Sequence, residues 1–403
     1  MTKIVVSHPH GNQNVNRVVS LLEKLNLLDS FWTTIAIPFN LKFFKKRYFL
    51  GIRYKNIRLN LIKELLRHFF KILNLKKLYH FERSIFSIDS IYRDLDIRVS
   101  NYIKSNAKNI DAIYSYEDCA LNSFQLAKKK EIRTIYDLTS PYWILKEKLL
   151  KEEVQLHPQW NLTASEIFST EKSLNKDKEI SLSDQIIVAS NFSAKSLEYY
   201  KQKKLNIKII PYGCPKHAST KMNIRKINEK LKIIYAGRLV LSKGIQYLIE
   251  SLHNVDLPWE LEIAGLCPEP PEQISKRLSL FLKDSRCNFL GQISNDKLLE
   301  KMKNSHIFML PSLYEGFGQV LLEAISCGLP VITTENTGGP DFIKNGHNGF
   351  ITPIRDTKQT IEILQKLYHN EDFRISISEN SIITSKEFSW EKYNNQIKNL
   401  FNE

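Results

Sequence analysis

Two positively charged residues in the second half of the chain are spaced so that they could bind a diphosphate. Arg238 directly follows an apolar, β-branched run, and Lys243 lies five residues later, where a helix opens at Gly244. Two cations beside the N-terminus of a helix can neutralise phosphate oxygens. An ordinary strand-to-helix turn with solvated charges would have the same sequence, so these residues alone leave both interpretations open.

Two carboxylates follow in the same half, separated by a glycine loop. Glu315 and Glu323 are eight positions apart, and Gly316, Phe317 and Gly318 form a tight loop between them before a helical stretch. Glycines let backbone N–H groups approach phosphate oxygens closely. Carboxylates on either side of a phosphate could accept hydrogen bonds from sugar hydroxyls. Together the two motifs predict a site for a sugar phosphate.

Alternating strand and helix signals predict the elements that position these residues. A parallel sheet with helices on both faces fits this rhythm, and such sheets bind ligands at the carboxyl ends of their strands. A chain of 403 residues is too long for one ordinary core, so we expect two Rossmann-like, doubly wound α/β lobes. The predicted strands are residues 3–7, 31–37, 111–115, 133–137, 184–190 and 207–213, then 231–237, 259–265, 287–291, 306–312 and 330–334.

Punctuating residues suggest where the lobes divide. Pro211, Gly213 and Pro215 end a strand and are followed by a polar, Lys-rich stretch. We therefore place the boundary there, with residues 1–213 in an N-terminal lobe and residues 214–387 in a C-terminal lobe. Residues 388–403 form a separate amphipathic helix.

The net charge of +15 is concentrated in one window. Residues 41–80 hold 12 Lys and Arg against one acid, Glu64, together with eight aromatic residues. This basic insertion would suit an anionic membrane surface, a phosphate-bearing acceptor or, less readily, nucleic acid. Apolar residues from Leu61 to Leu73 have helical spacing. The helix could pack on the sheet with solvated cations outside, or it could contact lipid or a lipid-linked acceptor.

Apolar runs and cysteines indicate where in the cell the protein is expected. No apolar run approaches the roughly 18 residues that span a bilayer, and the N-terminus has no secretory pattern. Five scattered cysteines without a CxxC pair fit reduced thiols. We expect a cytoplasmic protein, peripheral on the inner face of the membrane if the basic insertion binds lipid.

Loops after strands of the first half are further candidates. His8 to Asn12 follow the first strand, so the amides of Gly11 and Asn12 could meet donor or acceptor. Two histidines two apart lack a partner cluster, which favours a cleft-lining loop over a metal site, and we expect no metal. Glu117 and Asp118 could bind acceptor hydroxyls, or cap the next helix as Asp commonly does.

The second half resembles the E-x7-E signature of the retaining, GT-B-fold glycosyltransferases of glycosyltransferase family 4, the glycosyl transferases group 1. The first half matches only in rhythm and in D-Q-I-I-V-A-S (184–190). The likeness consists of A-G-R…K-G (236–244), E-G-F-G…E-A…G-x-P-V (315–331), T-G-G-P (337–340), N-G-F (348–350), I-I-P-Y-G (209–213) and F-S-W-E (388–391).

This resemblance implies that residues 1–213 form an acceptor-binding lobe and residues 214–387 a nucleotide-sugar-binding lobe. The two lobes would face each other across a cleft, and the last helix would cross back to the first lobe. It implies transfer of a hexose from a nucleotide-diphosphate sugar to a glycan or lipid-linked acceptor, with retention, in glycolipid or surface-polysaccharide synthesis. The donor is a substrate, and no bound cofactor is implied. Arg238 and Lys243 would bind the diphosphate, so that no metal is needed, and Glu323 would hold the ribose.

The remaining contacts implied by the resemblance concern the sugar and the base. Glu315 would contact the donor sugar, and the amides of Gly316, Phe317 and Gly318 would contact sugar and phosphate. Gly237 belongs to the diphosphate element, and the backbone of Leu290 and Gly291 would lie near the base. One departure is that many relatives have a His-Asp pair where this chain has Tyr136-Asp137. The donor sugar is therefore left open, and Asp137 is a candidate active-site residue.

Other functions would account for parts of the sequence. An NAD-linked dehydrogenase is disfavoured because no GxGxxG follows the first strand. A non-catalytic, basic membrane- or nucleic-acid-binding protein would explain residues 41–80, but it has no need for the four charged residues of the second half. A sugar phosphorylase or a nucleotide-sugar epimerase on the same fold stays open.

Overall fold

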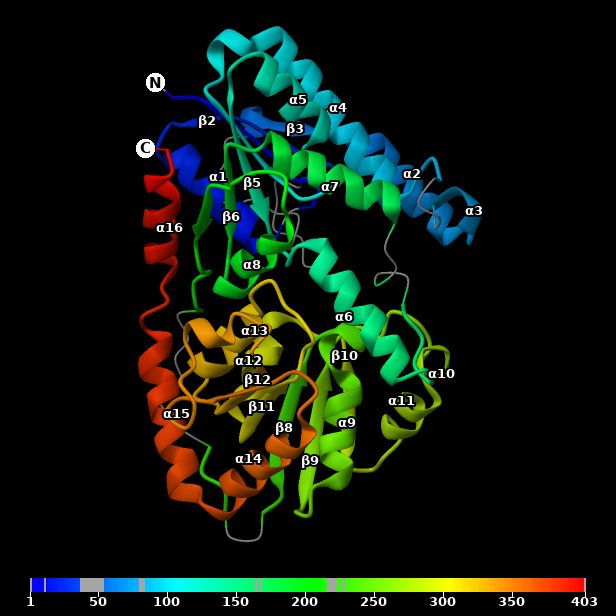
Figure 1. Ribbon diagram of the computed structural model, residues 1–403, viewed down its shortest axis with the longest axis vertical. Helices are drawn as coiled ribbons and strands as arrows, with labels where there is room; N and C mark the ends of the chain where they lie inside the picture. Colours follow the sequence, from blue (N-terminus) through cyan, green and yellow to red (C-terminus); the bar gives the residue numbers. More distant parts are fainter. Residues whose placement is uncertain are drawn as a thin grey trace.

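The protein has two α/β lobes arranged along its long axis (Figure 1). The computed structural model describes residues 2–10, 12–36, 54–79, 84–163, 166, 169–215, 223–226 and 229–401. Each lobe contains one parallel sheet with helices around it, which confirms the predicted fold class of two doubly wound lobes.

The first lobe is built on a seven-stranded sheet in the order β3-β2-β1-β4-β5-β6-β7, with every neighbouring pair parallel. Its strands are β1 (Ile4–Ser7), β2 (Leu28–Thr33), β3 (Ile57–Leu59), β4 (Ala112–Tyr116), β5 (Arg133–Leu138), β6 (Gln185–Val188) and β7 (Ile207–Ile209). Its helices are α1 (Gln13–Lys24), α2 (Leu61–Ile72), α3 (Lys76–Tyr79), α4 (Ile88–Asn106), α5 (Leu121–Lys129), α6 (Trp143–Leu156), α7 (Thr170–Leu182) and α8 (Asn191–Ser196).

The second lobe has a six-stranded parallel sheet in the order β10-β9-β8-β11-β12-β13. Its strands are β8 (Leu231–Ala236), β9 (Trp259–Ala264), β10 (Cys287–Gly291), β11 (Ile307–Leu310), β12 (Val331–Thr334) and β13 (Phe350–Thr352). Its helices are α9 (Ile245–Asn254), α10 (Pro271–Ile274), α11 (Lys276–Phe281), α12 (Asn295–Lys303), α13 (Gln319–Ser326), α14 (Thr357–His369) and α15 (Glu371–Ser385), followed by α16 (Trp390–Asn399).

The central strands form because their apolar side chains are covered on both faces. Every residue of β1 and of β11 is buried, as expected for strands inside a doubly wound sheet. Two strands were missed by the sequence analysis, β3 and β13, each only three residues long. The predicted strand 31–37 also lies later in the chain than β2, because β2 begins at Leu28 and ends at Thr33.

The last helix packs on the first lobe rather than on the second. Trp390, Tyr393, Ile397 and Leu400 are buried in one apolar cluster with residues of β1 and α1. The chain crosses between the lobes beside this helix, where the Cys214 amide donates to the Phe388 carbonyl over 2.6 Å. This hydrogen bond joins the segment that enters the second lobe to the segment that leaves it.

An earlier segment of the chain also crosses from the first lobe to the second. The crossing segment, which we define as α6 and the described residues after it up to Glu166, starts from the first lobe and packs against the second (Figure 1). Leu150 and Trp160 are buried in the apolar core of the second lobe. Glu153 accepts hydrogen bonds from Gln246 (2.8 Å) and Tyr247 (2.6 Å) of α9. The boundary predicted near residue 213 does not anticipate this crossing.

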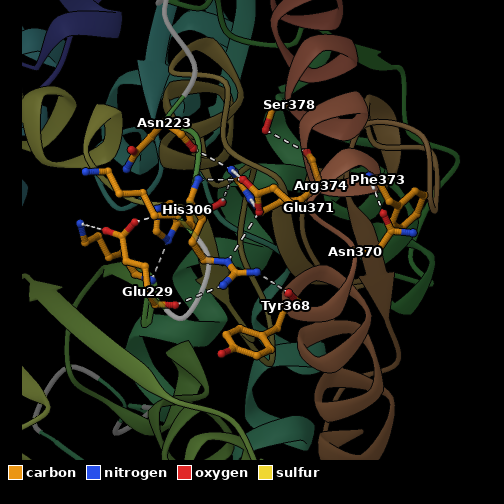
Figure 2. A network of polar contacts seen from close by, with 12 residues as sticks. Asn223, Glu229, His306, Tyr368, Asn370, Glu371, Phe373, Arg374 and Ser378 are labelled. Atoms are coloured by element: carbon orange, nitrogen blue, oxygen red, sulfur yellow. Dashed lines mark hydrogen bonds and ion pairs between the residues drawn. The ribbon is translucent and has the colours of Figure 1, made fainter.

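A buried ionic network stabilises the second lobe at the amino ends of its strands (Figure 2). Arg374 is 1% exposed and pairs with Glu371 one turn earlier in α15, its Nε lying 3.0 Å from Oε2. It also donates to the Asn223 carbonyl over 2.6 Å. The nearby His306 imidazole is buried, and burial lowers its pKa to about 4, so it is neutral at pH 7. This network holds the segment entering β8 against α15.

Candidate active site

The structure brings Lys243 and Glu315 together at the carboxyl ends of two adjacent strands. Lys243 ends a short 3-10 helix after β8, and Glu315 lies in the loop after β11. Their side chains form an ion pair and are 22% and 16% exposed. The sequence predicted both residues for one site, and they do lie in contact.

Close packing of the two loops fixes this pair. Gly244 has φ +67°, and a Cβ there would lie 1.8 Å from the Pro311 carbonyl oxygen, so only glycine allows the loops to touch. The Leu313 amide also donates to the Ser242 carbonyl over 2.9 Å. The backbone therefore sets the position of Lys243 relative to the loop that carries Glu315.

The loop that carries Glu315 faces the first lobe. A Cβ on Gly316 would lie 2.0 Å from the carbonyl oxygen of Thr139, which follows β5. The Gly316 carbonyl accepts hydrogen bonds from the hydroxyls of Ser190 (2.6 Å) and Ser193 (2.8 Å) at the start of α8. The glycine loop thus lies at the contact between the lobes. Neither serine was singled out from the sequence.

Glu323 lies in α13, which begins after this loop. Gly318 has φ +77° and precedes the first turn of the helix, and Phe317 is buried. The Glu323 carboxylate accepts a hydrogen bond from the Asn295 side chain over 2.8 Å. Burial raises the pKa of Glu323, and the bond from Asn295 acts in the opposite direction. Asn295 opens α12 and was not singled out from the sequence.

The other predicted contacts of the second lobe line the same sheet edge. Arg238 is exposed directly after β8, and its carbonyl accepts a hydrogen bond from Tyr235 over 2.8 Å. A Cβ on Gly265 would lie 1.7 Å from the Gly237 carbonyl oxygen, so the ends of β8 and β9 touch. Leu290 and Gly291 end β10, where the Gly291 carbonyl accepts from the Gly265 amide over 2.8 Å.

The first-lobe candidates are not gathered in the same way. Asp137 is 5% exposed and accepts a hydrogen bond from Tyr114 over 2.7 Å, beneath the surface of the lobe. Burial raises its pKa to about 7. Asn12 is exposed and caps α1 by accepting from the Val15 amide over 2.9 Å. Gly11 lies outside the described residues.

A charged cluster lies at the end of β4, where Glu117 and Asp118 were noted from the sequence. Glu117 pairs with Lys176 of α7 over 2.5 Å, and Asp118 pairs with Lys172 over 3.2 Å. Burial lowers the pKa of Lys146, at the start of α6, to about 8. The i, i+4 spacing of Lys172 and Lys176 on one helix face was the signal that could have revealed this cluster.

The commoner interpretation of Asp118, that it caps the next helix, is wrong, because Asp118 does not cap α5. The first amides of α5 are bound by carboxylates from other helices instead. Asp96 of α4 accepts from the Asn122 amide over 2.6 Å, and Glu179 of α7 accepts from the Ala120 amide over 2.9 Å. Asp118 is thus left facing the two lysines of the cluster.

Within the described residues, no group of three or more His, Cys, Asp or Glu side chains is arranged to hold a metal ion.

The crossing segment supplies one further carboxylate to this region. Glu166 is 3% exposed, and its Oε1 accepts a hydrogen bond from the Ser242 amide over 2.7 Å. Its other oxygen accepts from the amide and the hydroxyl of Thr163, each over 3.1 Å. Glu166 therefore binds the residue that directly precedes Lys243. Nothing in the sequence around Glu166 indicated this contact, since its partner is 76 positions away.

The family described as Glycosyl transferases group 1 matches residues 218–383. An uncharacterised glycosyltransferase of Methanocaldococcus jannaschii is 29% identical over 170 residues, covering 42% of this chain and 47% of that protein. The capsular polysaccharide biosynthesis glycosyltransferase CapM of Staphylococcus aureus is 35% identical over 161 residues, covering 38% and 41%. These matches span less than half the length of the two relatives.

Solved structures match the whole fold. A sucrose-phosphate synthase from Thermosynechococcus elongatus has a TM-score of 0.70 at 16% identity, covering 100% of this chain and 98% of that one. Anabaena Alr3699/HepE, solved in complex with UDP-glucose, has a TM-score of 0.66 at 15% identity and covers 100% of both chains. The chain has the GT-B fold, and its residues 218–383 match the family described as Glycosyl transferases group 1.

Proposed function

We propose that this protein transfers a hexose from a nucleotide-diphosphate sugar to a glycan or lipid-linked acceptor, with retention at the anomeric carbon. The single observation that carries the proposal is the contact of Lys243 with Glu315 at the loop that meets the first lobe. A cation for phosphate and a carboxylate for the sugar are thus held within one hydrogen bond of each other. The match of residues 218–383 to the glycosyl transferases group 1 family supports this interpretation of the pair.

The proposed chemistry follows from where charge develops. As the bond between the anomeric carbon and the diphosphate oxygen breaks, negative charge grows on the phosphate. Lys243, Arg238 and the N-terminus of α13 would stabilise that charge, and fixed groups of this kind lower the barrier without reorganisation. The acceptor hydroxyl forms the new bond on the same face, and its proton passes to a departing phosphate oxygen. In this scheme the two cations take the place of a divalent metal.

The donor is identified by a thermal-shift screen of the full chain against UDP-, GDP- and ADP-sugars. One of the three should raise the melting temperature, because a ligand at 100 times its Kd adds about 2.7 kcal/mol of stability. Transfer assays with and without inorganic phosphate then separate a transferase from a sugar phosphorylase, and product analysis reveals an epimerase. A chain that none of these donors stabilises would contradict the proposal.

Glu166 is expected to position Lys243 without touching the substrate. Glu166→Ala removes the acceptor for the Ser242 amide, so the Lys243 loop loses a support. We expect kcat to fall by about tenfold to a hundredfold while the donor KM changes less, since small displacements of a catalytic group are costly. Steady-state kinetics of the purified variant would measure both constants.

The matched control is Asn161→Ala in the same crossing segment. Asn161 donates to the Gln273 carbonyl over 2.7 Å and contributes to docking the segment, but it does not contact Ser242. If Asn161→Ala lowers kcat as much as Glu166→Ala does, the effect belongs to docking of the segment and Glu166 has no special role.

We also propose that the protein acts in the cytoplasm, peripheral at the inner face of the membrane, in glycolipid or surface-polysaccharide synthesis. The basic window 41–80 supports this placement. Lys45, Lys46 and Arg47, which the sequence offers for testing it, lie outside the described residues. The part of the window that is described carries the inference below.

A further inference from the structure

Exposed apolar side chains are concentrated in one short stretch of the first lobe. Seventeen large apolar side chains are exposed among the described residues, and eight of them lie between residues 62 and 88. Soluble proteins rarely expose so many apolar side chains in one contiguous patch without a binding role. The eight residues are Ile62, Leu65, Phe69, Ile72, Leu73, Leu75, Ile85 and Ile88.

Four of these residues form a stripe along α2, which we call the α2 stripe: Ile62, Leu65, Phe69 and Ile72. Their steps of three, four and three residues place them on one helix face. Their exposed fractions are 67%, 55%, 53% and 82%. The simpler sequence interpretation had the apolar face of this helix packed on the sheet, whereas the structure turns this stripe outward.

Other side chains attach α2 to the lobe. Lys63 contacts Asp94 of α4 over 3.6 Å and donates to Ser90 over 3.3 Å. Phe70 is half-buried and packs against Phe86, with ring centroids 4.9 Å apart. The α2 stripe is therefore exposed on a helix that is anchored to the fold. Figure 1 shows α2 and α3 at the side of the first lobe away from α16.

The exposed charged side chains described in α2 and α3 are positive. Lys71 and Lys77 are exposed beside it. The one acid of α2, Glu64, is buried and lies 3.4 Å from His68. An outward apolar stripe flanked by cations is complementary to an anionic lipid surface, which offers phosphate groups above an apolar layer.

We propose that the α2 stripe docks in the plane of an anionic bilayer, with its apolar side chains at the headgroup–acyl boundary and Lys71 and Lys77 at lipid phosphates. α2 has twelve residues, and within the described part of the chain no helix is long and apolar enough to cross a membrane. This docking does not depend on the proposed transfer reaction. Under the proposed function, it would also bring a lipid-linked acceptor to the first lobe.

The test is co-sedimentation of the full chain with vesicles of phosphatidylcholine, alone or mixed with phosphatidylglycerol. The chain should bind the mixed vesicles, and more weakly as salt rises. The double variant Phe69→Glu/Ile72→Glu should lower this binding by about tenfold or more. Lys71→Gln/Lys77→Gln should lower it less and reduce its salt dependence.

The matched control is Leu280→Glu/Ile383→Glu, which adds the same charge at two side chains that are 61% and 58% exposed on the second lobe. It should bind vesicles like the unmodified chain. Equal binding by the stripe variant and the control overturns the proposal, as does equal binding to neutral and anionic vesicles. Light scattering tests whether the stripe instead binds a second copy of the chain. If the parent chain is a dimer and the stripe variant is a monomer, the membrane proposal is overturned.

The outcome is independent of the transfer reaction. Donor-dependent thermal stabilisation of the stripe variant should equal that of the parent chain, because α2 lies on the first lobe and the donor groups lie on the second. Failure of the proposed function would abolish that stabilisation in both proteins, whereas failure of docking would leave it intact.

Discussion

Lys243→Ala is expected to lower sugar transfer by about a hundredfold to a thousandfold while the protein stays folded. The lysine would stabilise the charge that develops on the leaving diphosphate, and that charge is largest in the transition state. Its side chain is partly exposed and its partner Glu315 is also solvent-accessible, so the fold does not depend on the pair. Measurement of kcat/KM with the donor found in the screen tests this value, and circular dichroism reports the fold.

Glu315→Ala should cause a loss of similar size, because the carboxylate would hold the transferred sugar. The control is Lys301→Ala, which removes an ion pair with Glu262 at similar exposure in the same lobe. Lys301 lies on α12 and outside the candidate site, so its variant should keep the parent rate. If Lys243→Ala and Glu315→Ala both transfer sugar at the parent rate, the site assignment is wrong.

Arg374→Ala is expected to destabilise the second lobe by about 2–3 kcal/mol, because a buried guanidinium that bonds Glu371 and the Asn223 carbonyl is lost, while Arg225 still pairs with Glu371 over 3.6 Å. Arg374 is 1% exposed, and Glu371 is bound by both Arg374 and the Arg225 amide. These contacts lower the pKa of Glu371 against the effect of its burial. Denaturant unfolding at pH 7 would measure the change in the free energy of unfolding.

A matched pair of variants separates the ion pair from simple packing. Arg374→Met keeps most of the buried volume without the charge, so any stability that it recovers relative to Arg374→Ala is due to packing rather than to the ion pair. Ser376→Ala, at an exposed position of the same helix, should change stability by less than about 0.5 kcal/mol. A loss below about 1 kcal/mol in Arg374→Ala would show that Glu371 is adequately solvated without its partner.

Local sequence patterns predicted the parts of the fold that depend on local chemistry. Predominantly apolar runs predicted β1, β8 and β11, because a strand buried on both faces needs apolar residues at most of its positions. Three-residue edge strands such as β3 carry too few residues for such a pattern. Their pairing is decided by the neighbouring strand.

The second-lobe site was predictable because its residues follow strands of one parallel sheet. Lys243 and Glu315 are 72 positions apart, yet strand adjacency places both at the same edge. The roles assigned to these two residues, to Arg238 and to Glu323 stay predictions. Asp137 lies within β5, where it accepts a hydrogen bond from Tyr114, and its assignment to the active site also stays a prediction.

Hydrophobic periodicity did not predict the packing of the crossing segment or the orientation of the α2 stripe. An amphipathic helix has the same spacing whether its apolar face meets a sheet or a solvent boundary, so the outward direction of the α2 stripe was not readable. The docking of Trp160 and Glu166 on the second lobe depends on contacts far apart in sequence. Such contacts are set by tertiary packing and leave no local pattern.

The most direct measurement of the central claim is a crystal structure of the protein with the nucleoside diphosphate selected by the donor screen. We predict that the diphosphate lies within hydrogen-bonding distance of Lys243, Arg238 and the amides of residues 316–318, with the ribose at Glu323. Diphosphate density elsewhere, with the Lys243–Glu315 pair unchanged and unliganded, would contradict the account.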